Sequence, residues 1–168
     1  MERKRLRYLR LPSKGFNFPY LLFLPPNVGD KQFPYLLVEP NNSGVVSDEL
    51  NLQRLPALDL AAVNSDGNAV ALKLGTPFLV PIFPRPSLGS SNLYTHALSR
   101  PTILVAGGPL KRIDLQLAAM IDDARKRLAA QRHPVEKKVL LEGFSALGMF
   151  ISRFTFLHPE MVAAAACG

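Results

Sequence analysis

A serine in a glycine-flanked turn is the residue of this sequence best suited to act as a nucleophile. The stretch Gly143-Phe-Ser-Ala-Leu-Gly148 follows a short apolar segment, Lys137–Glu142, and precedes an apolar segment that we expect to be helical. A tight turn from strand to helix forces strained dihedral angles on the serine and raises its hydroxyl group to the edge of the sheet. The helix that follows offers free amide groups and the positive end of its dipole to a developing oxyanion. Ser145 is therefore a candidate nucleophile, with the backbone amide of Ala146 as an oxyanion donor.

The alternative interpretation of Ser145 is structural. Serine is favoured at the N-terminus of a helix, where its side-chain oxygen accepts a hydrogen bond from an amide of the first turn. A Gly-X-Ser tripeptide is also common by chance. The catalytic interpretation therefore depends on the strand before the turn, the helix after it and the segments upstream.

Apolar strands alternate with helices along the chain. Continuous apolar runs predict buried strands, and apolar residues at spacings of three and four predict a long helix. The expected strands are Phe16–Leu24, Pro34–Glu39, Pro77–Phe83 and Lys137–Glu142, and the expected helices are Leu58–Val63, Ala69–Leu74, Arg112–Gln131 and Gly143–Leu157. This order predicts an α/β fold with a mostly parallel sheet and helices on both faces. The carboxyl ends of the parallel strands then share one edge, where ligands bind in such sheets.

With these segments identified, the sequence resembles the α/β-hydrolase superfamily, in particular its serine esterases and depolymerase-like hydrolases, over most of its length. The turn Gly143–Ala146 is similar to the nucleophile elbow of that superfamily. The other similar segments are Tyr35–Gly44 (third strand and oxyanion loop), Phe78–Arg85 (fourth strand), Leu93–Leu98, Arg112–Leu117 and Arg153–Glu160. One departure is Leu147, because the family has a small residue two positions after the serine.

The resemblance implies that Ser145 attacks a carboxylic ester and forms an acyl-enzyme. It also implies that the backbone amides of Asn41 and Asn42, in the loop after the third strand, join Ala146 as oxyanion donors. The same loop can be interpreted as a simple turn, since Asn and Gly tolerate left-handed dihedral angles. The sequence leaves both interpretations open.

The sequence pattern lacks a base and an acid for the serine. A serine hydroxyl is a weak nucleophile without an adjacent base, and the superfamily supplies Asp or Glu and then His after the serine. Here Glu160 and His158 occur in the reverse order, at the far end of the helix that Ser145 opens, roughly 20 Å away. His133 precedes the strand and lies at the opposite edge. His96 is expected on the correct edge, either as a possible contact at the edge of the site or as a histidine that holds its own loop.

Two functions are consistent with this pattern. The first is a serine hydrolase of the carboxylic-ester type that is incomplete in this chain, with a partial hydrolase domain over residues 15–168, cut short after the strand that follows the nucleophile helix. Its substrate would be a small-molecule ester, with no cofactor and no metal. The alternative is a catalytically inactive hydrolase-like module for binding or interaction. Either way, we expect Met161–Ala166 to be an unprotected apolar edge strand and a site of self-association.

Composition and charge exclude several other classes. The chain has 168 residues, 48% hydrophobic and 20% charged, which suits one globular domain. Of its net charge of +7, residues 1–14 contribute +5, as a basic arm or an edge strand. Only Tyr8 in that stretch could stack on a base, so nucleic-acid binding is not favoured. Cys167 alone forms no internal disulfide. We expect no membrane span and no signal peptide, which leaves the cytoplasm as the default location.

Overall fold

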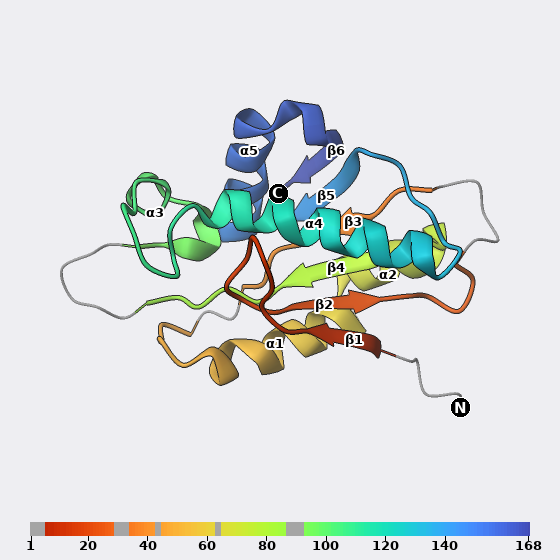
Figure 1. Ribbon diagram of the computed structural model, residues 1–168, viewed down its shortest axis with the longest axis horizontal. Coiled ribbons are helices and arrows are strands. Elements are labelled where there is room, and N and C mark those ends of the chain that lie inside the picture. Colours follow the sequence, from red (N-terminus) through yellow and green to blue (C-terminus); the bar gives the residue numbers. More distant parts are fainter. Residues whose placement is uncertain (1–5, 29–33, 43–44, 63–64, 87–92) are drawn as a thin grey trace.

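A six-stranded sheet forms the centre of the computed structural model, which describes residues 6–28, 34–42, 45–62, 65–86 and 93–168 (Figure 1). Its strands are β1 (Leu6–Arg10), β2 (Tyr20–Phe23), β3 (Leu37–Val38), β4 (Phe78–Pro81), β5 (Val139–Gly143) and β6 (Val162–Cys167). Their order across the sheet is β1-β2-β4-β3-β5-β6. The pairs β1–β2 and β2–β4 are antiparallel, whereas β4, β3, β5 and β6 run parallel. The predicted α/β fold with a mostly parallel sheet is confirmed.

Helices cover both faces of this sheet. One face packs against α1 (Leu50–Ala62) and α2 (Asp66–Leu74), and the other against α4 (Ile113–Ala130) and α5 (Ala146–Leu157). In Figure 1, α4 lies across the front of the strands. The remaining helical elements are short: η1 (Thr95–Ala97), α3 (Arg100–Ile103) and η2 (Pro159–Met161). No helix in the described ranges has both the length and the apolar character needed to cross a membrane.

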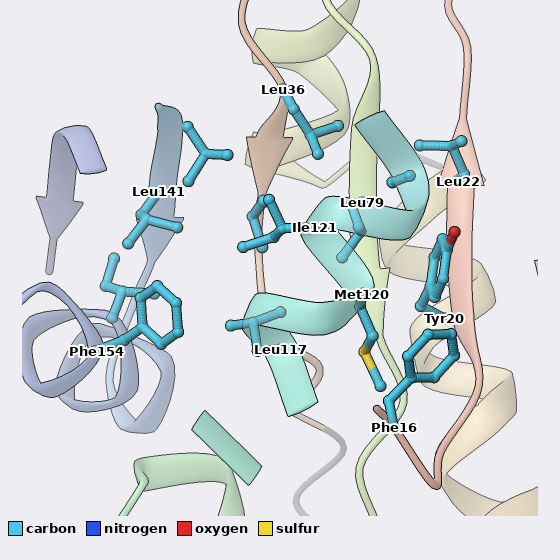
Figure 2. Packing of buried hydrophobic residues seen from close by; sticks show 14 of the residues in the cluster. Phe16, Tyr20, Leu22, Leu36, Leu79, Leu117, Met120, Ile121, Leu141 and Phe154 are labelled. Atoms are coloured by element: carbon cyan, nitrogen blue, oxygen red, sulfur yellow. The ribbon is translucent and has the colours of Figure 1, made fainter. Parts of the chain in front are cut away.

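The larger part of the core lies between α4, α5 and the sheet. Leu117, Met120 and Ile121 of α4 are fully buried and point toward the strands (Figure 2). They meet Leu79 of β4 and Leu141 of β5 within one apolar cluster. The apolar stripe predicted for this helix is therefore the face that it buries, and burial of such side chains supplies most of the driving force for folding.

Three elements differ from the sequence-based expectation. Helix α1 begins at Leu50, eight residues before the expected start, because it accommodates Pro56 within its length. Strand β3 has only two ladder residues rather than six. The stretch between β4 and α4, for which the sequence predicted no helix, contains η1 and α3. The basic N-terminal segment includes edge strand β1, and β6 forms the opposite edge.

A buried ion-pair network joins the start of α4 to the end of α5. Asp114 is fully buried and accepts two hydrogen bonds from Arg112, from Nε at 2.9 Å and from Nη2 at 2.7 Å. His158 Nε2 lies 3.0 Å from the same carboxylate. Burial alone would raise the pKa of Asp114, but the hydrogen bonds from Arg112 and His158 outweigh it, and the pKa falls below its ordinary value. His158, which the sequence places at the far end of the helix that Ser145 opens, is thus held there by a side-chain partner.

We predict that Asp114→Asn lowers the free energy of unfolding by about 2–3 kcal/mol, because Arg112 and His158 lose a buried ionic partner. Urea unfolding at pH 7 measures the change. The matched control is Asp122→Asn on the same helix, where the carboxylate is exposed and its pair with Arg125 spans 3.3 Å. That change should cost less than about 1 kcal/mol. Equal losses in the two variants would contradict a structural role for the network.

Candidate active site

Ser145 occupies a strained turn between β5 and α5. Its dihedral angles are φ 59° and ψ −121°, a region that residues with a side chain rarely adopt. Hydrogen bonds from the end of β6 hold the turn. The Ser145 amide donates to the Gly168 carbonyl at 2.8 Å, and the Gly168 amide donates to the Gly143 carbonyl at 3.0 Å. The Ser145 side chain is exposed and makes no capping hydrogen bond, so it does not act as a conventional helix N-cap.

Two glycines make this turn sterically possible. A Cβ atom on Gly143 would lie 2.7 Å from Cβ of Leu147, and one on Gly148 would lie 2.4 Å from the carbonyl oxygen of Gly168. Leu147, the departure from the family pattern, is buried and packs directly on Gly143. In this chain the residue that must be small is therefore Gly143, at the end of β5, and Gly148 leaves space for Gly168.

The oxyanion donors predicted from the sequence lie just after two neighbouring strands of the sheet, β5 and β3. Ala146 is the first residue of α5, while Asn41 and Asn42 follow β3, the strand beside β5. Within the described residues, the backbone amides of these three residues donate no hydrogen bond to another protein group. They are thus chemically available as donors, and their use by an oxyanion stays a prediction.

The Asn41 side chain fixes the loop after β3 to the loop after β4. Its Oδ1 accepts a hydrogen bond from the Phe83 amide at 2.9 Å, and its Nδ2 lies 3.3 Å from the Phe83 carbonyl oxygen. Asn41 is completely buried. A side chain that satisfies both backbone groups of one residue positions the loop firmly, because unpaired buried polar groups are costly.

His96 lies beneath the same loop. It is 1% exposed, and its Nε2 lies 2.9 Å from the Phe83 carbonyl oxygen, which requires the proton to be on Nε2. Burial, with a smaller contribution from Arg85, lowers the pKa of His96 to about 4, so the ring is neutral at pH 7. These contacts agree with a histidine that holds its own loop. A direct contact with a substrate stays a prediction.

No base contacts the serine within the described part of the chain. The Ser145 hydroxyl forms no hydrogen bond to a histidine or carboxylate there. His158 is engaged with Asp114, and His96 with Phe83. Among the same residues, no group of three or more His, Cys, Asp and Glu side chains is arranged to hold a metal ion.

Sequence reasoning missed two carboxyl groups beside the site. Glu39 follows β3 directly, and Glu142 precedes Gly143 on β5. Glu39 is only 8% exposed, and its Oε2 has no hydrogen-bond partner among the described residues. The signal that could have found the pair is a glutamate at the carboxyl end of each of two apolar strands.

We predict that Gly143→Ala destabilises the protein by about 1–3 kcal/mol, because the added methyl group overlaps Leu147. Gly107→Ala is the matched control, since a Cβ at that glycine meets no atom within 4 Å. Thermal unfolding of both variants measures the difference. If the Gly143→Ala protein is as stable as the control, the predicted overlap between the added methyl group and Leu147 is wrong.

Comparison with known proteins supports this description of the fold. No protein-family model matches the sequence, and no curated protein matches it. Among solved structures, poly(aspartic acid) hydrolase-1 from Sphingomonas sp. KT-1 aligns with a TM-score of 0.56 at 16% identity, over 95% of this chain and 54% of that one.

Two esterase structures align less closely. A thermostable esterase gives a TM-score of 0.49 at 21% identity, over 88% of this chain and 36% of that one. The rice cell wall degrading esterase LipA from Xanthomonas oryzae gives 0.49 at 16% identity, over 89% and 37%. The chain thus spans between about a third and just over half of the length of these structures. Its strand order and its likeness to the poly(aspartic acid) hydrolase structure give it an α/β-hydrolase-like fold.

Proposed function

We propose that this chain carries the nucleophile of a serine hydrolase that acts on carboxylic esters, and that Ser145 is that nucleophile. The strained turn at Ser145 is the observation that carries the proposal, because it exposes a hydroxyl group at the carboxyl edge of a parallel sheet. A costly backbone conformation persists only where surrounding structure enforces it, and such residues cluster at active sites. The similar solved structures are named as esterases and a hydrolase, which adds support for this class of reaction.

The proposed reaction begins with attack of Ser145 Oγ on the ester carbonyl carbon. The hydroxyl proton passes to a base, and the carbonyl oxygen becomes an oxyanion near the amides of Ala146 and of Asn41 or Asn42. Collapse of this intermediate breaks the bond to the ester oxygen, which takes the proton from the base and leaves as the alcohol, and the acyl group stays on Ser145. Water then hydrolyses this acyl-enzyme to the carboxylic acid and the free serine hydroxyl. The described residues bring no base to the hydroxyl, so we expect the chain alone to react slowly.

This proposal predicts that imidazole added to the solution rescues acylation of Ser145. Imidazole can take the proton that no side chain takes, and general-base catalysis is worth about 10²–10⁴-fold. The measurement is the rate of covalent labelling by a fluorophosphonate, with and without imidazole, and mass spectrometry of the labelled peptide. Slow labelling at Ser145 that imidazole accelerates is the expected result.

Two variants separate the possible outcomes of this experiment. Ser145→Ala should abolish labelling, whereas Ser152→Ala, at an exposed serine on the same helix, should leave it unchanged. Labelling that survives in Ser145→Ala would refute the assignment of the nucleophile. Fast, stoichiometric labelling of the unmodified protein without imidazole would instead show that the chain already holds a base.

The second candidate function is an interaction module without catalysis, and the edge strand β6 favours it. Val162 is buried, but Ala163–Cys167 are exposed, and this strand contains neither a charged residue nor proline. Its pairing with β5 shifts register between Val162 and Ala164, and from Ala164 to Cys167 the pairing is regular. Native edge strands are usually protected by charge, proline or a bulge. We therefore propose that β6, with the preceding Met161, is a surface for self-association.

A lysine on β6 should prevent such association. We predict that the unmodified chain shows a concentration-dependent mass in light scattering, and that Ala164→Lys reduces it to the mass of a monomer, because an edge lysine disfavours strand pairing. Ala130→Lys, at an exposed alanine at the end of α4, is the matched control and should not change the association. A monomer at every concentration would count against this surface.

A further inference from the structure

Glu39 and Glu142 lie side by side at the ends of two neighbouring parallel strands. The register pairs Leu37 with Leu140 and Val38 with Leu141, so its next step places Glu39 opposite Glu142. Side chains alternate between the faces of a sheet. Leu37 and Leu140 pack toward α1 and α2, so both glutamates are on that face. Two carboxyl groups thus lie directly before the two segments that carry the candidate site.

The surroundings of Glu39 disfavour a negative charge. The residue is more than nine-tenths buried, and its Oε2 accepts no hydrogen bond from a described residue. It packs against the first turn of α2, where a Cβ on Gly67 would lie 2.1 Å from Oε2. Within that turn, the Asn68 amide donates to Ser65 Oγ at 3.0 Å and the Ala69 amide to the Ser65 carbonyl oxygen, so neither serves Glu39.

The charged groups that face Glu39 are all acidic. Glu142 approaches it from β5 and Asp66 from α2. On the other side, the register places Val80 of β4 next to it, and no lysine, arginine or histidine of the described residues pairs with it. An ionised Glu39 would therefore lack a counter-charge among the described residues and a hydrogen bond at Oε2.

We propose that Glu39 is held as a neutral carboxylic acid and that, together with Glu142, it positions the ends of β3 and β5. Ionisation of Glu39 would place two negative charges at adjacent positions of the sheet and loosen residues 40–42 and 143–146. This inference uses the proposed function only to assign those residues to an active site. The effect on the strand ends does not depend on catalysis.

The direction of the pH dependence follows from the same contacts. Burial, followed by repulsion from Glu142 and Asp66, raises the pKa of Glu39 to about 8, and burial raises the pKa of Glu142 as well. In the unfolded chain a glutamate ionises near pH 4.3. Between these values the folded protein binds one more proton than the unfolded chain, so stability falls as the pH rises and levels off above about pH 8.

The test compares the unmodified protein with Glu39→Gln in urea unfolding from pH 5 to 9.5. The unmodified protein should lose stability as the pH rises toward 8, and Glu39→Gln should lack that loss, because an amide does not ionise. Hydrogen exchange, corrected for the intrinsic pH dependence, should show lower protection of the hydrogen-bonded amides of Glu39, Phe83 and Ser145 at pH 9 than at pH 6, but only in the unmodified protein. Glu136→Gln, which removes one exposed carboxylate, should behave like the unmodified protein.

A second variant keeps the proposal testable if Glu39→Gln does not fold. Glu142→Gln removes the nearest like charge, so the loss of stability should be smaller and should end at a lower pH. Infrared spectroscopy at pH 6 should also detect a protonated carboxyl band that disappears at pH 9.5. The same pH dependence in the unmodified protein, Glu39→Gln and Glu142→Gln would overturn the proposal. That result would leave the labelling of Ser145 unaffected, so the two proposals can fail separately.

Discussion

The turn at Ser145 depends on two backbone hydrogen bonds with Gly168, which accepts one and donates the other. One satisfies the amide of the strained serine and the other the carbonyl of Gly143. An isolated residue at φ 59° and ψ −121° would relax to an ordinary conformation, because such a conformation costs about 1–3 kcal/mol. The end of β6 therefore belongs to the site, although none of its side chains is a candidate for the chemistry. Gly143 and Gly148 are glycines because the neighbouring atoms of Leu147 and Gly168 lie too close to leave space for a Cβ atom.

The other half of the candidate site is fixed by side chains rather than by the sheet. Strand β3 is so short that its loop is held by Asn41, whose amide binds both backbone groups of Phe83, and by His96 below it. At the ends of the strands themselves, Glu39 and Glu142 occupy adjacent positions. The polar contacts of Asn41 and His96 and the two carboxyl groups thus bear on where the loop that holds Asn41 and Asn42 stands relative to Ser145.

Local patterns in the sequence predicted the features that local physics determines. The apolar stripe of α4, the apolar strands and the strand–turn–helix around Ser145 all follow from periodicity and from glycine placement. Helix α1 was partly missed because Pro56 is a helix breaker in most contexts, and packing against the sheet overrides that tendency here. The contact of Asp114 with His158 could not be predicted, because it joins residues 44 positions apart through the tertiary fold. A glutamate at the end of each of two apolar strands is visible in the sequence, but the order of the strands, which makes Glu39 and Glu142 neighbours, is not.

The two-residue strand β3 has a further consequence for how the molecule opens. It lies at the centre of the strand order and is the link between β1, β2 and β4 on one side and β5 and β6 on the other. On each side β3 pairs at two ladder positions, and backbone hydrogen bonds such as Leu37 to Pro77 and Leu140 to Leu36 flank them. Proteins open in cooperative units whose boundaries follow weak contacts. The hydrogen bonding of the sheet is therefore narrowest at β3, but α4 joins Leu79 and Leu141 in one core cluster across it, so an opening that separates Asn41 from Ser145 would also have to displace α4.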